Sequence, residues 1–135
     1  MRSFRIVIAG HGSFPESLRA TTEMIVGPVA DLVTVGLAAG QTPDHFAEDL
    51  RAAIGHDGRH VLVLCDLLGG TPFNVASAIA RRSPRVVCVA GVNLVMAVEA
   101  VLTDGDLDEA AVERLLEAGR SGVAESERHR ARRVS

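Results

Sequence analysis

Short apolar runs alternate with longer amphipathic segments along most of this 135-residue chain. The apolar runs are rich in Val, Ile and Leu, as buried strands are, and the segments between them carry apolar residues at helical spacing. Four repeats of a strand followed by a helix predict an α/β domain, a parallel sheet with helices on both faces. Because crossovers between parallel strands are right-handed, the economical order for four strands is 2-1-3-4, as in flavodoxin-like doubly wound sheets.

Glycines, prolines and N-cap residues set the expected boundaries of these elements. Ser13, Thr42 and Thr71 are the expected N-caps of the first three helices, each with a proline in the turn that follows. The predicted strands cover residues 4–9, 31–35, 61–65 and 86–90, and the predicted helices cover 15–26, 43–54, 72–82, 94–102 and 108–119.

The composition indicates one globular domain, since 47% of the residues are apolar and such a chain can bury a core without metals or disulfides. We expect this domain to cover residues 1–123. A basic, poorly ordered tail is expected at 124–135, where four Arg and one His lie within 128–133. The formal net charge of −3 argues against nucleic-acid binding. No signal peptide or segment of membrane-spanning length is found, which predicts a cytoplasmic protein.

The two cysteines, Cys65 and Cys88, both fall inside apolar runs. Cysteines in such positions are typically buried and behave as small apolar side chains. We therefore expect two free thiols and no disulfide.

The candidate site lies where the strand order of the predicted sheet reverses. Ligands of doubly wound sheets bind beyond the carboxyl ends of the strands at this switch point, here between strands 1 and 3. His11, Gly12 and Ser13 follow strand 1, and Asp66 follows strand 3. The topology therefore predicts that His11 and Asp66 share one crevice.

A histidine paired with a carboxylate can act as a nucleophile. The carboxylate fixes the tautomer through one ring nitrogen, leaves the lone pair of the other nitrogen free, and stabilises the charge that develops on the ring. The glycines on either side of His11 leave its ring open to a bulky partner. We therefore expect His11 to be the nucleophile and Asp66 to orient it.

The turn "GGTP" after strand 3 adds an anion site. Free backbone N–H groups and the helix dipole favour an anion at a helix N-terminus. Gly12, Ser13, Gly69 and Gly70 are the candidate phosphoryl-binding residues, and Thr71 either caps the helix or donates its hydroxyl to a phosphoryl oxygen. An imidazole beside such a turn predicts phosphoryl transfer through a phosphohistidine, with no metal and no cofactor.

Three segments resemble the signature motifs of the mannose-family EIIA domain, the cytoplasmic phosphocarrier of the bacterial phosphoenolpyruvate-dependent sugar phosphotransferase system. They are "IVIAGHGSFPESL" (6–18), "DLLGGTPFNVAS" (66–77) and "VVCVAGVNLVMAVEA" (86–100), and the resemblance extends over residues 4–122. It implies that His11 accepts a phosphoryl group from HPr and passes it to an EIIB domain on a separate chain. Asp66 matches the carboxylate that orients the histidine, and Thr71 matches a position beside the phosphoryl group. The EIIC and EIID membrane components would take part indirectly.

The resemblance also implies a homodimer in which an additional C-terminal strand is exchanged between the two chains. This sequence departs from the family pattern in two places. Val95 stands where proline is common in the third segment, and the stretch after Val123 is a poor strand. The second departure weakens the expectation of strand exchange.

Two other functions fit parts of the same pattern. A regulatory or non-sugar phosphoacceptor domain could use His11 and then act by binding another protein. Small tetrapyrrole metal chelatases also open with a strand and a "GHGS"-like turn, but they use a second histidine at another strand end. Here His45 falls on a predicted helix, while His56 and His60 lie at the opposite end of strand 3. One imidazole and one carboxylate make a poor metal site, so chelation is the weakest alternative.

Overall fold

A computed structural model describes residues 1–127 of the protein. The strands are β1 (Arg5–His11), β2 (Leu32–Leu37), β3 (Val61–Cys65) and β4 (Val86–Val89). The helices are α1 (Phe14–Val26), α2 (Pro43–Ile54), α3 (Thr71–Arg82), α4 (Leu94–Leu102) and α5 (Glu109–Ser121).

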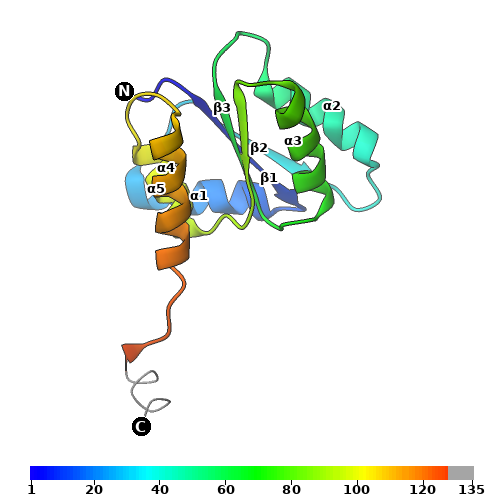
Figure 1. Ribbon diagram of the computed structural model, residues 1–135. Helices are drawn as coiled ribbons and strands as arrows, with labels where there is room; N and C mark the ends of the chain where they lie inside the picture. Colours follow the sequence, from blue (N-terminus) through cyan, green and yellow to red (C-terminus); the bar gives the residue numbers. More distant parts are fainter. Residues whose placement is uncertain (128–135) are drawn as a thin grey trace.

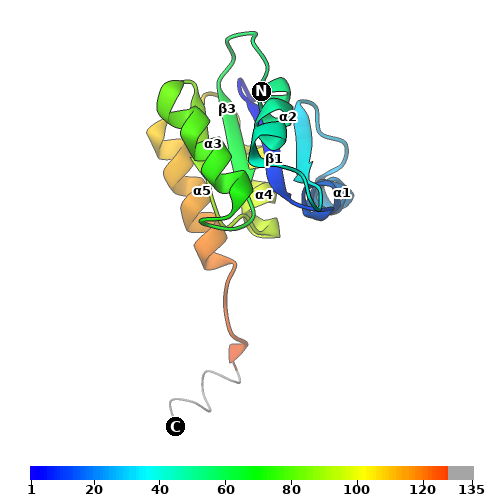
Figure 2. The same cartoon turned by 90° about the vertical axis from the view of Figure 1, so that its right-hand side faces the viewer.

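The four strands form one parallel sheet in the order β2-β1-β3-β4, which confirms the predicted topology. Helices α1, α4 and α5 cover one face of the sheet, and α2 and α3 cover the other (Figure 1). Figure 2 looks onto the layer formed by α2 and α3. The strand order reverses between β1 and β3, so the expected switch point lies at the carboxyl ends of these two strands.

The core consists of two apolar clusters, one on each face of the sheet. Ile6 and Ile8 of β1 belong to the cluster beneath α1, α4 and α5. Val7 and Ala9 belong to the cluster on the other face, with Phe46 of α2. Successive side chains of a strand point to opposite faces, so a strand covered on both sides must be apolar throughout. This requirement explains the unbroken apolar runs of β1 and β3.

Strand β1 is two residues longer at its carboxyl end than the sequence predicts. The expected strand ends at Ala9, whereas Gly10 and His11 continue the pairing with Gly36 and Leu37 of β2. Neighbouring-strand hydrogen bonds overcome the poor strand propensity of glycine here. His11 is therefore fixed by the sheet rather than carried on a loop.

Two of the predicted N-caps differ from expectation. Ser13 lies at the N-cap of α1, but its side chain makes no capping hydrogen bond because its backbone (φ −88°, ψ 1°) is not extended. Gly70, not Thr71, is the N-cap of α3, and Thr71 is already the first helical residue. The prediction that Thr71 caps this helix is therefore wrong. Thr42 does cap α2, accepting a hydrogen bond from the His45 backbone N–H at 3.2 Å.

Residues 122–127 follow α5 and lead away from the sheet (Figures 1 and 2). No strand forms within residues 123–127. Most of the predicted basic tail, residues 128–135, lies outside the described part of the chain. Among residues 1–127, none of the helices has both the length and the apolar character needed to cross a membrane.

Candidate functional site

The structure brings His11 and Asp66 together at the switch point of the sheet. His11 is the last residue of β1, and Asp66 directly follows the last residue of β3. These strands are neighbours, with Ala9 paired to Cys65. Because parallel strands end at the same edge of the sheet, the two side chains emerge side by side. This proximity is the one that the strand order predicts.

One carboxylate oxygen of Asp66 holds both the backbone and the ring of His11. The backbone N–H of His11 donates to Oδ2 of Asp66 at 2.8 Å, and Nδ1 of the ring lies 2.9 Å from the same oxygen. A carboxylate accepts but does not donate when ionised, so the proton between them belongs to Nδ1. The other ring nitrogen, Nε2, then carries the free lone pair.

The Asp66 carboxyl group is largely buried, whereas the His11 side chain is open to solvent. Their side chains are 13% and 47% exposed, respectively. Burial alone would raise the pKa of Asp66, but the hydrogen bonds from the His11 backbone and ring outweigh it and hold this pKa below its usual range. The carboxylate is therefore ionised at neutral pH and can stabilise a positive charge on the ring.

Two glycines make room for the side chains of His11 and Asp66. A Cβ atom added at Gly10 would lie 2.8 Å from Oδ2 of Asp66, and one added at Gly70 would lie 2.9 Å from Cε1 of His11. The imidazole thus packs with its Cε1 edge against the N-cap of α3. Sequence reasoning assigned Gly70 to phosphoryl binding and gave Gly10 only the role of leaving the His11 ring open to a partner. The missing side chains at both positions are needed for the His11–Asp66 geometry.

A third glycine, Gly36, was missed by the sequence analysis. A Cβ atom there would lie 2.2 Å from the carbonyl oxygen of Gly12, and the Gly12 N–H donates to the Leu37 carbonyl at 2.9 Å. Gly12 has a φ of +56°, which glycine adopts without strain. The turn after His11 is therefore pressed against β2, and only glycine at position 36 permits this contact.

The turn between β3 and α3 is held by its own hydrogen bonds. The Gly70 N–H donates to the Leu67 carbonyl at 3.1 Å, and the Asn74 side-chain amide donates to the Gly69 carbonyl at 3.1 Å. The N–H groups of Gly12 and Gly70 are thus already used. Within residues 1–127, the N–H groups of Ser13, Gly69 and Thr71 make no hydrogen bond, nor does the hydroxyl of Thr71. These donors lie at the N-termini of α1 and α3, or within the turn that precedes α3.

Three further histidines lie in residues 1–127. His45 is in the first turn of α2, and His56 and His60 precede β3, at the opposite end of that strand. In the part of the chain that the structure describes, no three His, Cys, Asp or Glu side chains form a group that could hold a metal ion.

Exposed apolar side chains surround the carboxyl edge of the sheet. Leu67 and Leu68, in the turn after Asp66, are 58% and 73% exposed. Phe14 at the start of α1 and Val95 in the first turn of α4 are also exposed. We call these four residues the apolar rim. Apolar side chains gathered around a reactive group are typical of a surface that meets another protein.

Comparison with known proteins assigns the chain to a family. The family model EIIA-man, described as the fructose IIA component of the phosphotransferase system (PTS), matches residues 5–118. The fructose-specific EIIA component of Bacillus subtilis is 33% identical over 96 residues, which are 70% of this chain and 66% of that protein. The mannose-specific EIIAB component of Escherichia coli strain K12 is 34% identical over 123 residues, which are 87% of this chain and 38% of that protein.

Solved structures agree with this assignment. The mannose/sorbose-specific IIA subunit from Enterococcus faecalis matches with a TM-score of 0.87 and 34% identity, covering 94% of this chain and 96% of that one. The EIIA component from Streptococcus agalactiae matches with a TM-score of 0.84 and 31% identity, covering 90% and 96%. Sequence, fold and family model therefore agree that this chain belongs to the EIIA-man family of the phosphotransferase system.

Proposed function

We propose that this protein is a phosphocarrier of the sugar phosphotransferase system and that it carries the phosphoryl group on Nε2 of His11. The observation that carries the proposal is the 2.9 Å contact between Nδ1 and Oδ2 of Asp66. This contact leaves Nε2 as the nucleophilic nitrogen, on a ring that is half exposed and accessible to a second protein.

The proposed transfer is a single exchange of one N–P bond for another. The lone pair of Nε2 attacks the phosphorus of a phosphohistidine on the donor, the donor's N–P bond breaks, and its electron pair returns to the donor imidazole. The His11 ring gains positive charge as the new bond forms. The ionised Asp66 stabilises this charge through Nδ1–H, in the way that a triad carboxylate stabilises an imidazolium. Passing the phosphoryl group onward reverses these steps.

Backbone donors at the start of α3 support the anionic group. The free N–H of Thr71 and the positive end of the helix dipole favour negative charge there. The Thr71 hydroxyl has no partner among the described residues, so it is available to a phosphoryl oxygen. Thr71 is therefore proposed to bind the phosphoryl group. Gly70 is proposed to leave space for the His11 ring and not to donate to the phosphoryl group. Ser13 and Gly69 stay as proposed backbone donors, and Gly12 contributes its turn geometry.

The proposed partners are proteins. Phospho-HPr is the donor and an EIIB domain is the acceptor. EIIC and EIID take part only indirectly, through EIIB. The apolar rim around His11 suits such a protein contact. These partners work in the cytoplasm, where we place this protein. No cofactor or metal is needed for the exchange. The homodimer with an exchanged strand stays a prediction.

The test is intact mass after incubation with phosphoenolpyruvate, enzyme I and HPr. The native protein should gain one acid-labile phosphoryl group and lose it when EIIB is added. His11→Ala should gain none, whereas His45→Ala, which removes an exposed histidine on α2, should be phosphorylated like the native chain. No gain by the folded native protein, with HPr itself phosphorylated, would overturn the proposal. Stable phosphorylation that EIIB does not discharge would favour the regulatory alternative.

A further inference from the structure

The two cysteines of the chain lie on neighbouring strands with their sulfur atoms in contact. Cys65 ends β3 and Cys88 lies on β4, and their Sγ atoms are 3.9 Å apart. In the register of these strands Val63 pairs with Cys88, so Cys65 and Cys88 are diagonal neighbours on one face of the sheet. Both are free thiols. The expectation of two free thiols is confirmed, but their proximity comes from the register of the sheet.

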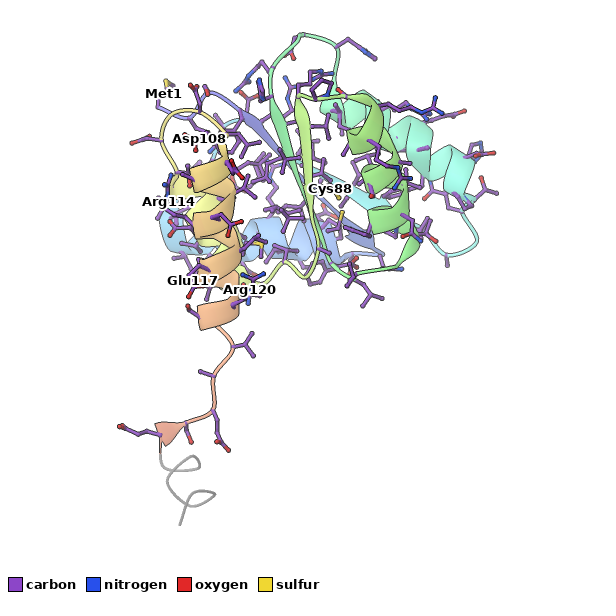
Figure 3. The ribbon with its side chains drawn as sticks, viewed as in Figure 1. Met1, Cys88, Asp108, Arg114, Glu117 and Arg120 are labelled. Atoms are coloured by element: carbon purple, nitrogen blue, oxygen red, sulfur yellow. The ribbon has the colours of Figure 1, made fainter. Side chains whose placement is uncertain are left out.

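The two thiols have different surroundings. Cys65 is fully buried in the core, with no exposed surface. Cys88 is only partly buried, and it lines a groove of about 480 Å³ at the β4 edge of the sheet. Its side chain is labelled in Figure 3. The other groove residues are apolar and include Leu68, Phe73 and Leu116. A small apolar reagent can therefore reach Cys88 from solvent but cannot reach Cys65.

The contact between the sulfurs shifts the pKa values of the two thiols in opposite directions. The hydrogen bond to Cys88, together with burial, raises the pKa of the Cys65 thiol, so Cys65 keeps its proton. The same hydrogen bond lowers the pKa of Cys88, because the Cys65 S–H can donate to a Cys88 thiolate. The more exposed sulfur is thus also the one with more thiolate character, and thiolates are the reactive form.

We propose that Cys88 is a site of reversible oxidation by alkyl hydroperoxides, with Cys65 as the resolving thiol. The Cys88 thiolate attacks the terminal oxygen of the hydroperoxide, the O–O bond breaks, and an alcohol leaves after taking up a proton. Cys88 becomes a sulfenic acid. The Cys65 sulfur then attacks the Cys88 sulfur, the S–O bond breaks, water leaves with the Cys65 proton, and a disulfide joins β3 to β4. The apolar groove selects alkyl hydroperoxides over hydrogen peroxide.

The first experiment treats the reduced protein with tert-butyl hydroperoxide and follows the thiols by mass spectrometry. The native chain should lose two hydrogen atoms and regain them with dithiothreitol. Cys65→Ser keeps a hydroxyl donor beside Cys88 but cannot form the disulfide, so it should accumulate a sulfenic acid at Cys88 that dimedone traps. Cys65→Ala lacks the donor and should react more slowly. Cys88→Ser should not react.

Three results would overturn this inference. The first is a native protein that stays reduced while glutathione in the same tube is oxidised. The second is a Cys88→Ser variant that reacts as fast as the native chain, and the third is a disulfide that links two chains instead of Cys65 to Cys88. The ratio of the oxidation rate with tert-butyl hydroperoxide to that with hydrogen peroxide should be higher for the protein than for glutathione. Equal ratios would show that the groove does not select the peroxide.

The oxidation has a consequence for His11, and this part rests on the proposed function. Diagonal neighbours must be drawn together to form a disulfide, which moves the end of β3, and Asp66 is the next residue. Phosphoryl acceptance by the oxidised protein should therefore fall by roughly 10- to 100-fold and return with dithiothreitol. Peroxide-treated Cys88→Ser serves as the control. If the reduced protein accepts no phosphoryl group, the proposed function fails while the thiol result stands. If oxidised and reduced protein accept it equally fast, the coupling is overturned.

Discussion

Oδ2 of Asp66 accepts two hydrogen bonds from His11, one from its backbone N–H at 2.8 Å and one from its ring Nδ1 at 2.9 Å. A single oxygen thus fixes both the position of the residue and the orientation of its ring. The second contact also determines the tautomer, and through it which nitrogen is free to react. The predictions on the site test what this pair and its neighbours contribute.

Replacing Asp66 with Asn should slow phosphoryl acceptance by about 10- to 100-fold, the range seen when the hydrogen-bonding partner of a metal-ligating histidine is removed. The amide has nearly the same shape but carries no negative charge, so the charge on the His11 ring is no longer stabilised. Rapid-quench phosphorylation by HPr measures the rate, and circular dichroism checks that the fold is retained. A native rate in the folded variant would exclude Asp66 from the site.

Replacing Gly70 with Ala should reduce phosphoryl acceptance because the added Cβ would lie 2.9 Å from Cε1 of His11. The ring must then turn away from Asp66. Gly119→Ala is the matched control: it adds the same methyl group within α5, where the nearest atom is the flexible Met96 methyl. The control should keep the native rate. Equal rates for the two variants would show that the His11 ring does not depend on the space at Gly70.

Thr71→Ala should slow phosphoryl acceptance, whereas Thr71→Ser should keep most of it, because the proposed role needs only the hydroxyl. The helix itself should not be affected, since Gly70 and not Thr71 is the N-cap of α3. Urea unfolding should therefore give the two variants free energies within about 0.5 kcal/mol of the native value. A loss of about 1 kcal/mol in Thr71→Ala alone would instead assign the hydroxyl to helix capping.

The lowered pKa of Asp66 makes part of the stability depend on pH. A carboxyl group whose pKa is lower in the folded state stabilises the fold above the pKa of the unfolded chain, about 3.9 for aspartate. This stabilisation is lost as the pH falls below that value and through the folded-state pKa. Asp31 and Asp57 also have lowered pKa values, so the native chain alone does not isolate Asp66.

The comparison that isolates Asp66 is the free energy of unfolding of native protein and Asp66→Asn, measured in urea between about pH 6 and pH 2. The native protein should be the more stable of the two near neutral pH. The difference should shrink as the pH falls, because protonation removes the charge that the variant lacks. A difference that stays constant down to pH 2 would mean that the Asp66 charge does not stabilise the fold.

Asn93 joins α4 to α5 and can be tested by stability alone. Its Oδ1 accepts the Met96 N–H at 3.0 Å, and its Nδ2 donates to the Gly119 carbonyl at 2.8 Å. Asn93→Ala should lower the free energy of unfolding by about 1–2 kcal/mol. Asn93→Ser keeps a capping oxygen but loses the bond to Gly119, so its loss should be intermediate. If the Ser variant is as stable as the native protein, that second bond contributes nothing.

The fold follows largely from the sequence because its signals are local. Apolar runs of strand length, helical spacing and turn residues lie within a few positions of one another, and they predict the boundaries of α2, β3 and α4 as the structure has them. Once four parallel strands are assigned, the handedness of crossovers leaves little freedom in strand order. The meeting of His11 with Asp66 is a consequence of that order.

Other features depend on contacts between distant segments, which the sequence does not reveal. Pairing of Gly10 and His11 with Gly36 and Leu37 extends β1 beyond the point where strand propensity would end it. Backbone conformation at Gly70 moves the start of α3 by one residue and releases the Thr71 hydroxyl. These outcomes come from sheet register and turn geometry, in which a shift of one residue changes every contact.

The sequence by itself determined that a histidine and a carboxylate stand at neighbouring strand ends, since strand order alone brings them there. Tertiary structure decided which ring nitrogen the carboxylate binds, which glycines must lack a side chain around the ring, and that the sulfurs of Cys65 and Cys88 come within 3.9 Å. The physical reason is that strand order follows from patterns along the chain. Contacts within a few ångströms are fixed only when the strands have locked into register and the side chains have packed.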